Sequence, residues 1–427
     1  MDNKKVLIIT YYWPPAGGPG VQRWLKFIKY LPEFNIEPIV FVPSNPSYPL
    51  RDESLLDEVS KDITIIKQPI IEPYKWASVV SKGKSKTISK GIITAAKGQS
   101  LSECFMLFIR GNFFIPDARK YWIKPSSKYL SEYISNNSID TVITTGPPHS
   151  VHLIGRNLKL KTKVNWFADF RDPWTNIGYH RQLKLLYFAR RKHRYLEKLI
   201  LNTADKIIVT SDKTKIIFQQ LTQQPLEVIT NGYDIETIDN VILDDVFSMA
   251  HIGSLLSERN PQILWEVLSE IVIENPDFAS LFQLKLIGAT SEQVLRSLAF
   301  FNLTGHVHVM EYVTHSEAIR HQRQSQILLL IEKDSEDTSY IIPGKLFEYM
   351  ASNRPILAIG PEKSDVADIL KNTHTGSYFL YHQKELIKKT ILGMFLDFQN
   401  HKLSVDPKRI EQYSRKNLTS MLARLIK

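Results

Sequence analysis

Short, uninterrupted runs of apolar residues recur along the chain and alternate with stretches of helical periodicity. A continuous apolar run of about 4 to 8 residues is typical of a parallel strand that is buried on both faces. The alternation of such strands with helices predicts the α/β class and parallel sheets. The predicted strands cover residues 5–11, 36–42, 63–66, 139–145, 163–168, 206–210, 226–230, 248–252, 283–287, 306–309, 326–331 and 355–359.

The strand and helix pattern restarts after residue 204, which predicts two domains in a chain of 427 residues. We expect a first domain over residues 1–204 and a second over residues 205–405. A terminal helix over residues 406–427 is long enough to pack back on the first domain. Two doubly wound, Rossmann-like sheets would then face each other across a cleft, which is the default ligand site.

A glycine-rich loop follows the first predicted strand and precedes a helix. Gly17 and Gly18 would let the backbone approach a bulky ligand closely, with Gln22 and Arg23 pointing toward it from the helix start. The spacing departs from G-x-G-x-x-G and does not support a dinucleotide fingerprint. A tight turn without a ligand is the alternative.

Two further loops of the first half carry candidate chemistry. In GPPHS, Pro147 and Pro148 place His149 at the carboxyl end of a strand, where open α/β sheets bind ligands. In FADFRDPW, Asp169, Arg171 and Asp172 follow a buried strand, and they either pair with one another or bind a polar ligand. The flanking aromatic residues favour a sugar or base ligand.

The second half carries the signs of a phosphate site. Lys345 begins a helix after a Pro-Gly turn, where the helix dipole adds to its charge, and Glu348 lies one turn later, suitably placed for ribose hydroxyls. Gly253 and Arg259 follow an earlier strand in the same manner as the glycine loop of the first half. The alternative is an ordinary amphipathic helix with solvated Lys345 and Glu348.

The net charge of +10 is unevenly distributed. Residues 1–204 hold 31 Lys and Arg against 16 Asp and Glu, a net of +15, and the remaining residues hold 23 against 28, a net of −5. A basic and aromatic segment within residues 75–128 predicts contact with an anionic membrane or with nucleic acid, the alternative being a solvated surface. No recognised nucleic-acid motif occurs, so we expect no nucleic acid partner.

The sequence shows no apolar run long enough for a spanning helix and no signal peptide, and Cys104 is the only cysteine. We therefore expect a cytoplasmic protein, peripheral at the inner face of the cell membrane. No cluster of His, Asp or Glu has the spacing of metal ligands, so we expect no obligatory metal and no cofactor.

Six motifs together carry a resemblance to a known family. They are GGPGVQR, GPPHSVHLIG, FADFRDPW, ITNGYD, HIGSLLSERNP and PGKLFEYMASNRPIL. In this order they resemble the GT-B glycosyltransferases of the retaining type, family 4-like, over nearly the whole chain. The resemblance implies an acceptor-binding first domain and a second domain that binds a nucleotide sugar.

The resemblance also implies roles for single residues. Arg259 and Lys345 would hold the donor diphosphate and Glu348 the ribose, while Gly17 and Gly18 would let their loop approach the donor. Two positions depart from the family pattern: Tyr340 stands where a carboxylate often contacts the donor sugar, and Ser254 stands where a basic residue often follows the glycine.

The expected reaction is transfer of a sugar from a nucleotide sugar to a hydroxyl of a lipid-linked or saccharide acceptor, in synthesis of a cell-surface polysaccharide. The catalytic candidates are His149, Asp169, Arg171 and Asp172. His149 or Asp172 would position the acceptor hydroxyl for attack on the front face of the sugar. The alternatives are a sugar-nucleotide 2-epimerase of the same fold, which needs no acceptor, and a non-enzymatic basic protein that binds lipid or nucleic acid.

Overall fold

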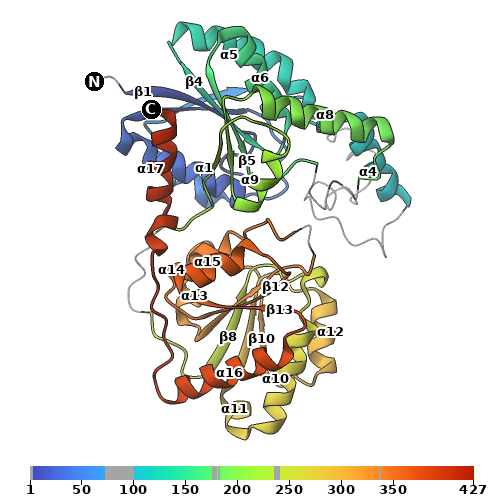
Figure 1. Cartoon of the computed structure of the whole chain (residues 1–427), viewed down its shortest axis with the longest axis vertical. Coiled ribbons are helices and arrows are strands. Elements are labelled where there is room, and N and C mark those ends of the chain that lie inside the picture. Colours follow the sequence, from blue (N-terminus) through green and yellow to red (C-terminus); the bar gives the residue numbers. More distant parts are fainter. Residues whose placement is uncertain (1–2, 73–100, 176–179, 181–182, 235–240, 336–337) are drawn as a thin grey trace. The chain divides into compact units, whose positions relative to one another are not determined.

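The chain folds into two compact units (Figure 1). The computed structural model describes residues 3–72, 101–175, 180, 183–234, 241–335 and 338–427. Unit 1 comprises Met1–Asn231 and Arg415–Lys427, and unit 2 comprises Gly232–Ser414. Much of the segment at 75–128 that the sequence marks as basic and aromatic, residues 75–100, lies outside the described residues.

Unit 1 contains a sheet of seven parallel strands in the order β3-β2-β1-β4-β5-β6-β7. Its strands are β1 (Lys4–Ile9), β2 (Ile36–Pro43), β3 (Thr64–Gln68), β4 (Thr141–Gly146), β5 (Asn165–Phe170), β6 (Lys206–Val209) and β7 (Leu226–Val228). The unit boundary lies at residue 231 and not at the predicted residue 204, because β6 and β7 continue the hydrogen-bonded ladder of the first sheet.

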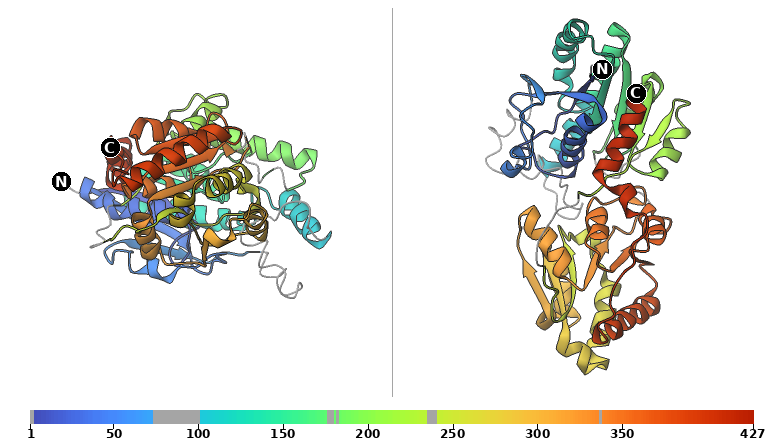
Figure 2. Two further views of the ribbon diagram at one scale, coloured as in Figure 1. Left: turned by 90° about the horizontal axis from the view of Figure 1, so that it is seen from below. Right: turned by 90° about the vertical axis from the view of Figure 1, so that its left-hand side faces the viewer.

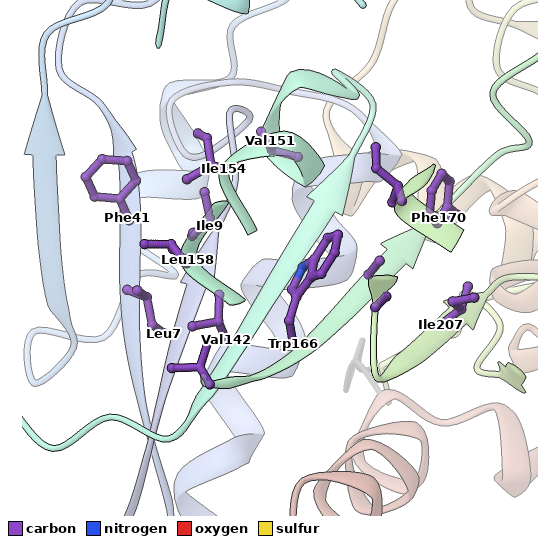
Figure 3. Close-up of a cluster of buried hydrophobic side chains, with 14 of the residues drawn as sticks. Leu7, Ile9, Phe41, Val142, Val151, Ile154, Leu158, Trp166, Phe170 and Ile207 are labelled. Atoms are coloured by element: carbon purple, nitrogen blue, oxygen red, sulfur yellow. The ribbon is translucent and has the colours of Figure 1, made fainter. Parts of the chain in front are cut away.

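Helices cover both faces of this sheet. They are α1 (Pro19–Tyr30), α5 (Ile123–Asn136), α6 (Ser150–Thr162), α8 (Tyr187–Thr203), α9 (Asp212–Gln219) and α17 (Arg415–Ile426), and α4 (Leu101–Phe113) contacts α8. The strand β1 is buried on both sides: Val6 and Ile8 pack in one apolar cluster, Leu7 and Ile9 in another. Figure 3 shows the second cluster, where α6 lies against β4 and β5.

The terminal helix α17 belongs to unit 1, where it packs beside α1 (Figure 1). Leu418, Leu422 and Ile426 are buried in the same cluster as Val6 and Ile8. The helix begins at Arg415, later than the predicted residue 406, and residues 406–414 belong to unit 2.

Unit 2 contains a sheet of six parallel strands in the order β10-β9-β8-β11-β12-β13. Its strands are β8 (Phe247–Ile252), β9 (Phe282–Ile287), β10 (Val307–Met310), β11 (Ile327–Ile331), β12 (Ile356–Gly360) and β13 (Gly376–Leu380). Its helices are α10 (Gln262–Glu274), α11 (Pro276–Leu281), α12 (Glu292–Phe300), α13 (His315–Gln324), α14 (Lys345–Ala351), α15 (Asp365–Thr373) and α16 (Lys384–Gln399).

The predicted α/β class is confirmed, with two doubly wound, Rossmann-like units. Every predicted strand overlaps an observed one, and β13 at the sheet edge was not predicted. Short 3-10 turns are η1 (Leu31–Phe34), η2 (Glu53–Leu56), η4 (Lys120–Trp122), η5 (Ser257–Arg259), η6 (Thr304–His306) and η8 (Ile410–Tyr413). Within the described ranges, no helix combines the length and the apolar character needed to span a bilayer.

Candidate functional site

Each sheet has one point at which the strand order reverses, and parallel sheets bind ligands there, beyond the carboxyl ends of the strands. In unit 1 this point lies between β1 and β4, and in unit 2 between β8 and β11. The glycine loop follows β1, the His149 loop follows β4, the Gly253 loop follows β8, and α14 follows β11. These four segments therefore lie at the two reversal points, each within its own unit, while Asp169, Arg171 and Asp172 lie at the carboxyl end of the next strand, β5.

Each glycine in the glycine loop of unit 1 has a different structural role. The N–H of Gly17 donates to the carbonyl of Leu50 at 3.1 Å, so this amide is already bonded within the protein. Gly18 caps α1 with a φ of 105°, a left-handed conformation that favours glycine. Gly20 leaves room for Arg171, whose Nη1 lies 1.3 Å from where a Cβ would be.

Asp169 is a structural residue, which corrects its prediction as a catalytic one. Its carboxylate is fully buried and accepts hydrogen bonds from Arg23 at 3.0 Å, Trp24 Nε1 at 2.8 Å and Thr145 Oγ1 at 2.8 Å. Burial would raise the pKa of Asp169, but Arg23 and the hydrogen bonds hold it below its usual value.

Arg23 lies in the same buried pair and not beside a ligand, because its second nitrogen donates to the carbonyl of Thr230 at 2.7 Å. The prediction that it points toward a ligand is therefore wrong.

Arg171 holds the His149 loop in place, and its catalytic contact stays a prediction. Its Nε donates to the carbonyl of Gly146 at 3.1 Å and its Nη2 to that of Pro147 at 2.8 Å. These carbonyls lie three and two residues before His149, so the guanidinium fixes the backbone of the loop from which the imidazole projects.

His149 and Asp172 are the predicted residues whose side chains keep unused hydrogen-bonding capacity in unit 1. The His149 ring stacks on Trp174 with centroids 4.5 Å apart and planes 9° apart, and its Nδ1 has no partner among the described residues. Burial lowers the pKa of His149 well below its usual value, so the imidazole is neutral and keeps a lone pair. Asp172 is half-buried, and burial raises its pKa while Arg171 lowers it.

Side chains of the basic helix α8 hold the backbone at Trp174 and Thr175 and the Trp174 ring on which His149 stacks. The sequence did not predict this role. Glu197 accepts hydrogen bonds from the backbone N–H groups of Trp174 and Thr175, both at 3.0 Å. His193 accepts one from Trp174 Nε1 at 3.1 Å. Ala189, His193 and Glu197 lie four residues apart on the buried face, which is the one sequence signal that could have revealed them.

In unit 2, the ammonium of Lys345 lies directly over Gly253. A Cβ at Gly253 would be 2.9 Å from Lys345 Nζ, and the φ of 113° at Gly253 again favours glycine. Lys345 Nζ is 3.2 Å from Nε2 of His251, a residue of β8 that lies two residues before Gly253. The helix α14 is also fixed to β8 by Tyr349, whose hydroxyl accepts from the N–H of Ile252 at 2.9 Å.

The two cations of this site have no acidic partner among the residues that the structure describes. Neither Lys345 nor Arg259 forms an ion pair with any residue that the structure describes, and both are half-buried. Burial and the charge of Arg259 lower the pKa of Lys345 to about 7, while Glu348 opposes that shift. Such a pair is suited to receive an anion that replaces the missing acids.

Glu348 lies one turn after Lys345 on α14 and also contacts α13. Its Oε2 accepts a hydrogen bond from Gln322 Nε2 at 3.3 Å. With Tyr233 and Asp234 it lines a crevice of about 20 Å³, room for roughly one water molecule. Its contact with a ribose stays a prediction.

Tyr340 is almost fully buried, with 6% of its surface exposed.

Within the described ranges, no cluster of three or more His, Cys, Asp or Glu side chains is arranged to hold a metal ion.

Comparison with protein families gives one match: residues 92–237 match Glycosyltransferase Family 4. This stretch contains His149 and Asp172 and spans about a third of the chain, 146 of 427 residues. Comparison with curated proteins finds no match.

Solved structures of similar fold cover nearly the whole chain. A glycosyltransferase from Rickettsia africae ESF-5 is 13% identical with a TM-score of 0.61, covering 100% of this chain and 98% of its own. Anabaena HepE in complex with UDP-glucose is 11% identical with a TM-score of 0.60, covering 99% of both chains. WaaG, a glycosyltransferase involved in lipopolysaccharide biosynthesis, is 12% identical with a TM-score of 0.55, also covering 99% of both. These similarities show that the chain has the GT-B fold.

Proposed function

We propose that this protein is a glycosyltransferase that moves a sugar from a nucleotide sugar to a hydroxyl of a lipid-linked or saccharide acceptor in cell-surface polysaccharide synthesis. The observation that carries the proposal is the pair of uncommitted cations, Lys345 and Arg259, at the reversal point of the second sheet. The family match over residues 92–237 and the GT-B fold support it. HepE, which shares the fold, binds UDP-glucose, and WaaG, which also shares it, acts in lipopolysaccharide biosynthesis.

In this proposal the cations stabilise the leaving group. When the bond between sugar and diphosphate breaks, negative charge develops on the phosphate oxygens, and fixed donors such as Lys345 and Arg259 stabilise it without reorganising. The sugar passes through an oxocarbenium-like state, as in glycoside chemistry. On the acceptor side, the neutral imidazole of His149 or the carboxylate of Asp172 orients the attacking hydroxyl.

The test begins with a screen of UDP-, GDP-, TDP- and CMP-sugars for thermal stabilisation, because a ligand that binds the native state must raise its stability. Lys345→Ala and Arg259→Ala are then expected to lower turnover of the sugar that binds by about 100-fold or more each. The matched controls are Lys371→Ala and Arg296→Ala, exposed cations on α15 and α12 that should leave turnover unchanged. Undiminished turnover in the first two variants contradicts the phosphate assignment.

Product analysis separates the proposed transferase from a sugar-nucleotide 2-epimerase. A transferase consumes the nucleotide sugar only with an acceptor or, slowly, with water, and releases a nucleoside diphosphate. A 2-epimerase changes the configuration of the sugar without any acceptor. Nuclear magnetic resonance of the transferred sugar also tests the retaining outcome that the resemblance implies.

We further propose that unit 1 contacts an anionic membrane surface at the cytoplasmic face, and that α8 provides much of the contact. Tyr187, Arg191, Tyr195 and Lys198 form an outward stripe along α8, and Tyr187 is 80% exposed. Arg190, Lys192 and Arg194 flank the stripe, and the only acid of the helix, Glu197, is buried.

The neighbouring helix α4 runs beside α8 in Figures 1 and 2 and exposes Phe105 and Phe113. Basic side chains mixed with exposed aromatics suit the headgroup region of an anionic bilayer. By contrast, Trp122, an aromatic residue of the basic and aromatic segment at 75–128, is buried.

Cosedimentation with vesicles tests this surface. Removing two cations by Arg191→Gln and Arg194→Gln should weaken binding to phosphatidylserine vesicles about tenfold or more, since each basic side chain near an anionic membrane contributes about 1 kcal/mol. Binding should also fall with added salt. The control is the double variant Lys61→Gln and Lys67→Gln, which removes the same number of charges. Lys61 lies just before β3 and Lys67 lies on it. Equal binding to neutral vesicles contradicts the proposal.

A further inference from the structure

His251 is a buried histidine that no step of the proposed reaction uses. It lies on β8, two residues before Gly253, and is 1% exposed. Its Nδ1 is 3.1 Å from the carbonyl oxygen of Leu329 on β11, and its Nε2 is 3.2 Å from Lys345 Nζ. The imidazole therefore bridges the two strands at the reversal point of the sheet and the one lysine of the anion site.

The partners of His251 fix its tautomer. A carbonyl oxygen can only accept, so the hydrogen of the neutral imidazole is on Nδ1, and Nε2 keeps a lone pair that accepts from Lys345. Burial and the charge of Lys345 lower the pKa of His251 well below its usual value, although the backbone of Leu329 and Ser254 opposes them. A neutral His251 is thus a fixed hydrogen-bond acceptor beneath the ammonium.

We propose that His251 is the positioning residue of the donor site: it holds the Lys345 ammonium over Gly253, at the place where the diphosphate of the nucleotide sugar binds. This inference rests on the proposed function and adds to it a residue that touches no substrate. Gly253 leaves the space, since a Cβ there would come within 2.9 Å of Lys345 Nζ. Arg259 provides a second cation but no acceptor for Lys345.

The same arrangement makes donor binding take up a proton. Three charged or titratable groups face Lys345: His251 on β8, Arg259 on η5 and Glu348 on α14 itself. Because the pKa of Lys345 is lowered to about 7, part of the free protein carries a neutral lysine above that pH. A bound diphosphate favours the ammonium and raises this pKa, so the apparent affinity falls as pH rises above 7, by up to about tenfold per pH unit.

Calorimetric titration in buffers of different ionisation enthalpy counts these protons. The probes are UDP-glucose, GDP-glucose and TDP-glucose, whose diphosphates are diesters and have no proton to exchange near neutral pH. For the probe that binds, we expect uptake of close to one proton at pH 8 and almost none at pH 6. Lys345→Met should abolish the uptake.

His251→Leu and His251→Gln form the matched pair. Leucine removes the acceptor, so the lysine is no longer held in place: affinity should fall about tenfold to 100-fold and the proton uptake at pH 8 should disappear. Glutamine offers an amide oxygen for Lys345 and a donor for Leu329, so it should keep affinity within a few fold and keep the uptake.

A second measurement serves if the leucine variant does not fold. The ¹⁵N spectrum of wild-type His251, assigned by its loss in His251→Gln, should show the Nδ1–H tautomer at pH 7 and a shift of Nε2 in Lys345→Met. An Nε2–H tautomer overturns the proposal. So does a His251→Leu variant with wild-type affinity and wild-type proton uptake. If wild-type protein binds none of the UDP-, GDP-, TDP- and CMP-sugars of the thermal screen, the proposed function fails and this inference fails with it, whereas unchanged His251 variants overturn the inference alone.

Discussion

The two units place charged side chains at equivalent points of similar sheets but use them differently. At the carboxyl ends of the first sheet, Arg23 is paired with Asp169, and Arg171 is bonded to the carbonyls of Gly146 and Pro147. At those of the second, Lys345 and Arg259 have no acid partner within the described chain. Charges of the first kind hold a loop in shape, whereas charges of the second kind are free for an anion.

This difference teaches how to separate structure from function in a charged motif. A buried ion pair with further hydrogen bonds costs stability when one partner is removed, because the other is left uncompensated. An unpaired, half-buried cation already costs desolvation, so its removal affects ligand binding more than stability. Substitutions at the two kinds of position should therefore affect different measurements.

The largest expected effect on stability is that of Asp169→Asn. The variant leaves the Arg23 guanidinium buried without a counter-charge, which should cost about 3 kcal/mol or more of the free energy of unfolding of unit 1. Hydrogen exchange of the backbone amides of β5 and β8 in urea measures the stability of unit 1 and unit 2 separately. Only the amides of β5 should lose protection in the variant.

Asp172→Asn is the control, at a carboxylate three residues after Asp169, just beyond the end of β5. Its carboxylate has no hydrogen-bond partner among the described residues, so stability should change by less than about 0.5 kcal/mol.

The pKa of Asp169 is lowered in the folded state, so the stability that its carboxylate contributes is present above the unfolded pKa and disappears as pH falls through the folded pKa. The gap between wild type and Asp169→Asn should then close in acid; a gap independent of pH contradicts the ion pair.

The sequence predicted the strands well and the partners of charged residues poorly. Continuous apolar runs specify buried parallel strands locally, which is why β1 or β11 could be found without tertiary information. The edge strand β13, Gly376–Leu380, contains glycine and serine and is only partly buried, so its pattern is weak. The sequence placed the boundary between the units too early because β6 and β7 are short, and a short apolar run does not indicate which sheet it joins.

Partners far apart in the sequence were beyond reach. Arg23 and Asp169 are 146 residues apart, and His251 and Lys345 are 94 apart. Residue types at the ends of strands indicated where a ligand site forms, but only the packing of helices on the sheet decides which charges are neutralised within the protein.

A smaller effect is expected at Glu197, which tests whether α8 supports the His149 loop. Glu197→Ala leaves the N–H groups of Trp174 and Thr175 without their acceptor and should cost about 2 kcal/mol. Glu197→Gln keeps an oxygen at the same place and should retain most of this stability. The measurement is urea unfolding together with near-ultraviolet circular dichroism of Trp174 stacked on His149. Equal losses in both variants would show that the negative charge, and not the hydrogen bonds, is what matters.

Among Asp169, Glu197 and Lys345, the smallest effect on stability is expected at Lys345, where the comparison between the units is sharpest. Lys345→Met keeps the apolar stem and removes the ammonium, so the free energy of unfolding at pH 7 should change by less than about 1 kcal/mol while donor affinity falls. The pKa of Lys345 is lowered to about 7 in the folded state, below its unfolded value. The unfolded chain therefore binds more protons between the two values, and wild-type stability should rise with pH relative to Lys345→Met above pH 7. Urea unfolding of both proteins at pH 7 and pH 9 measures this, and parallel curves at the two pH values would show that Lys345 is an ordinary solvated lysine.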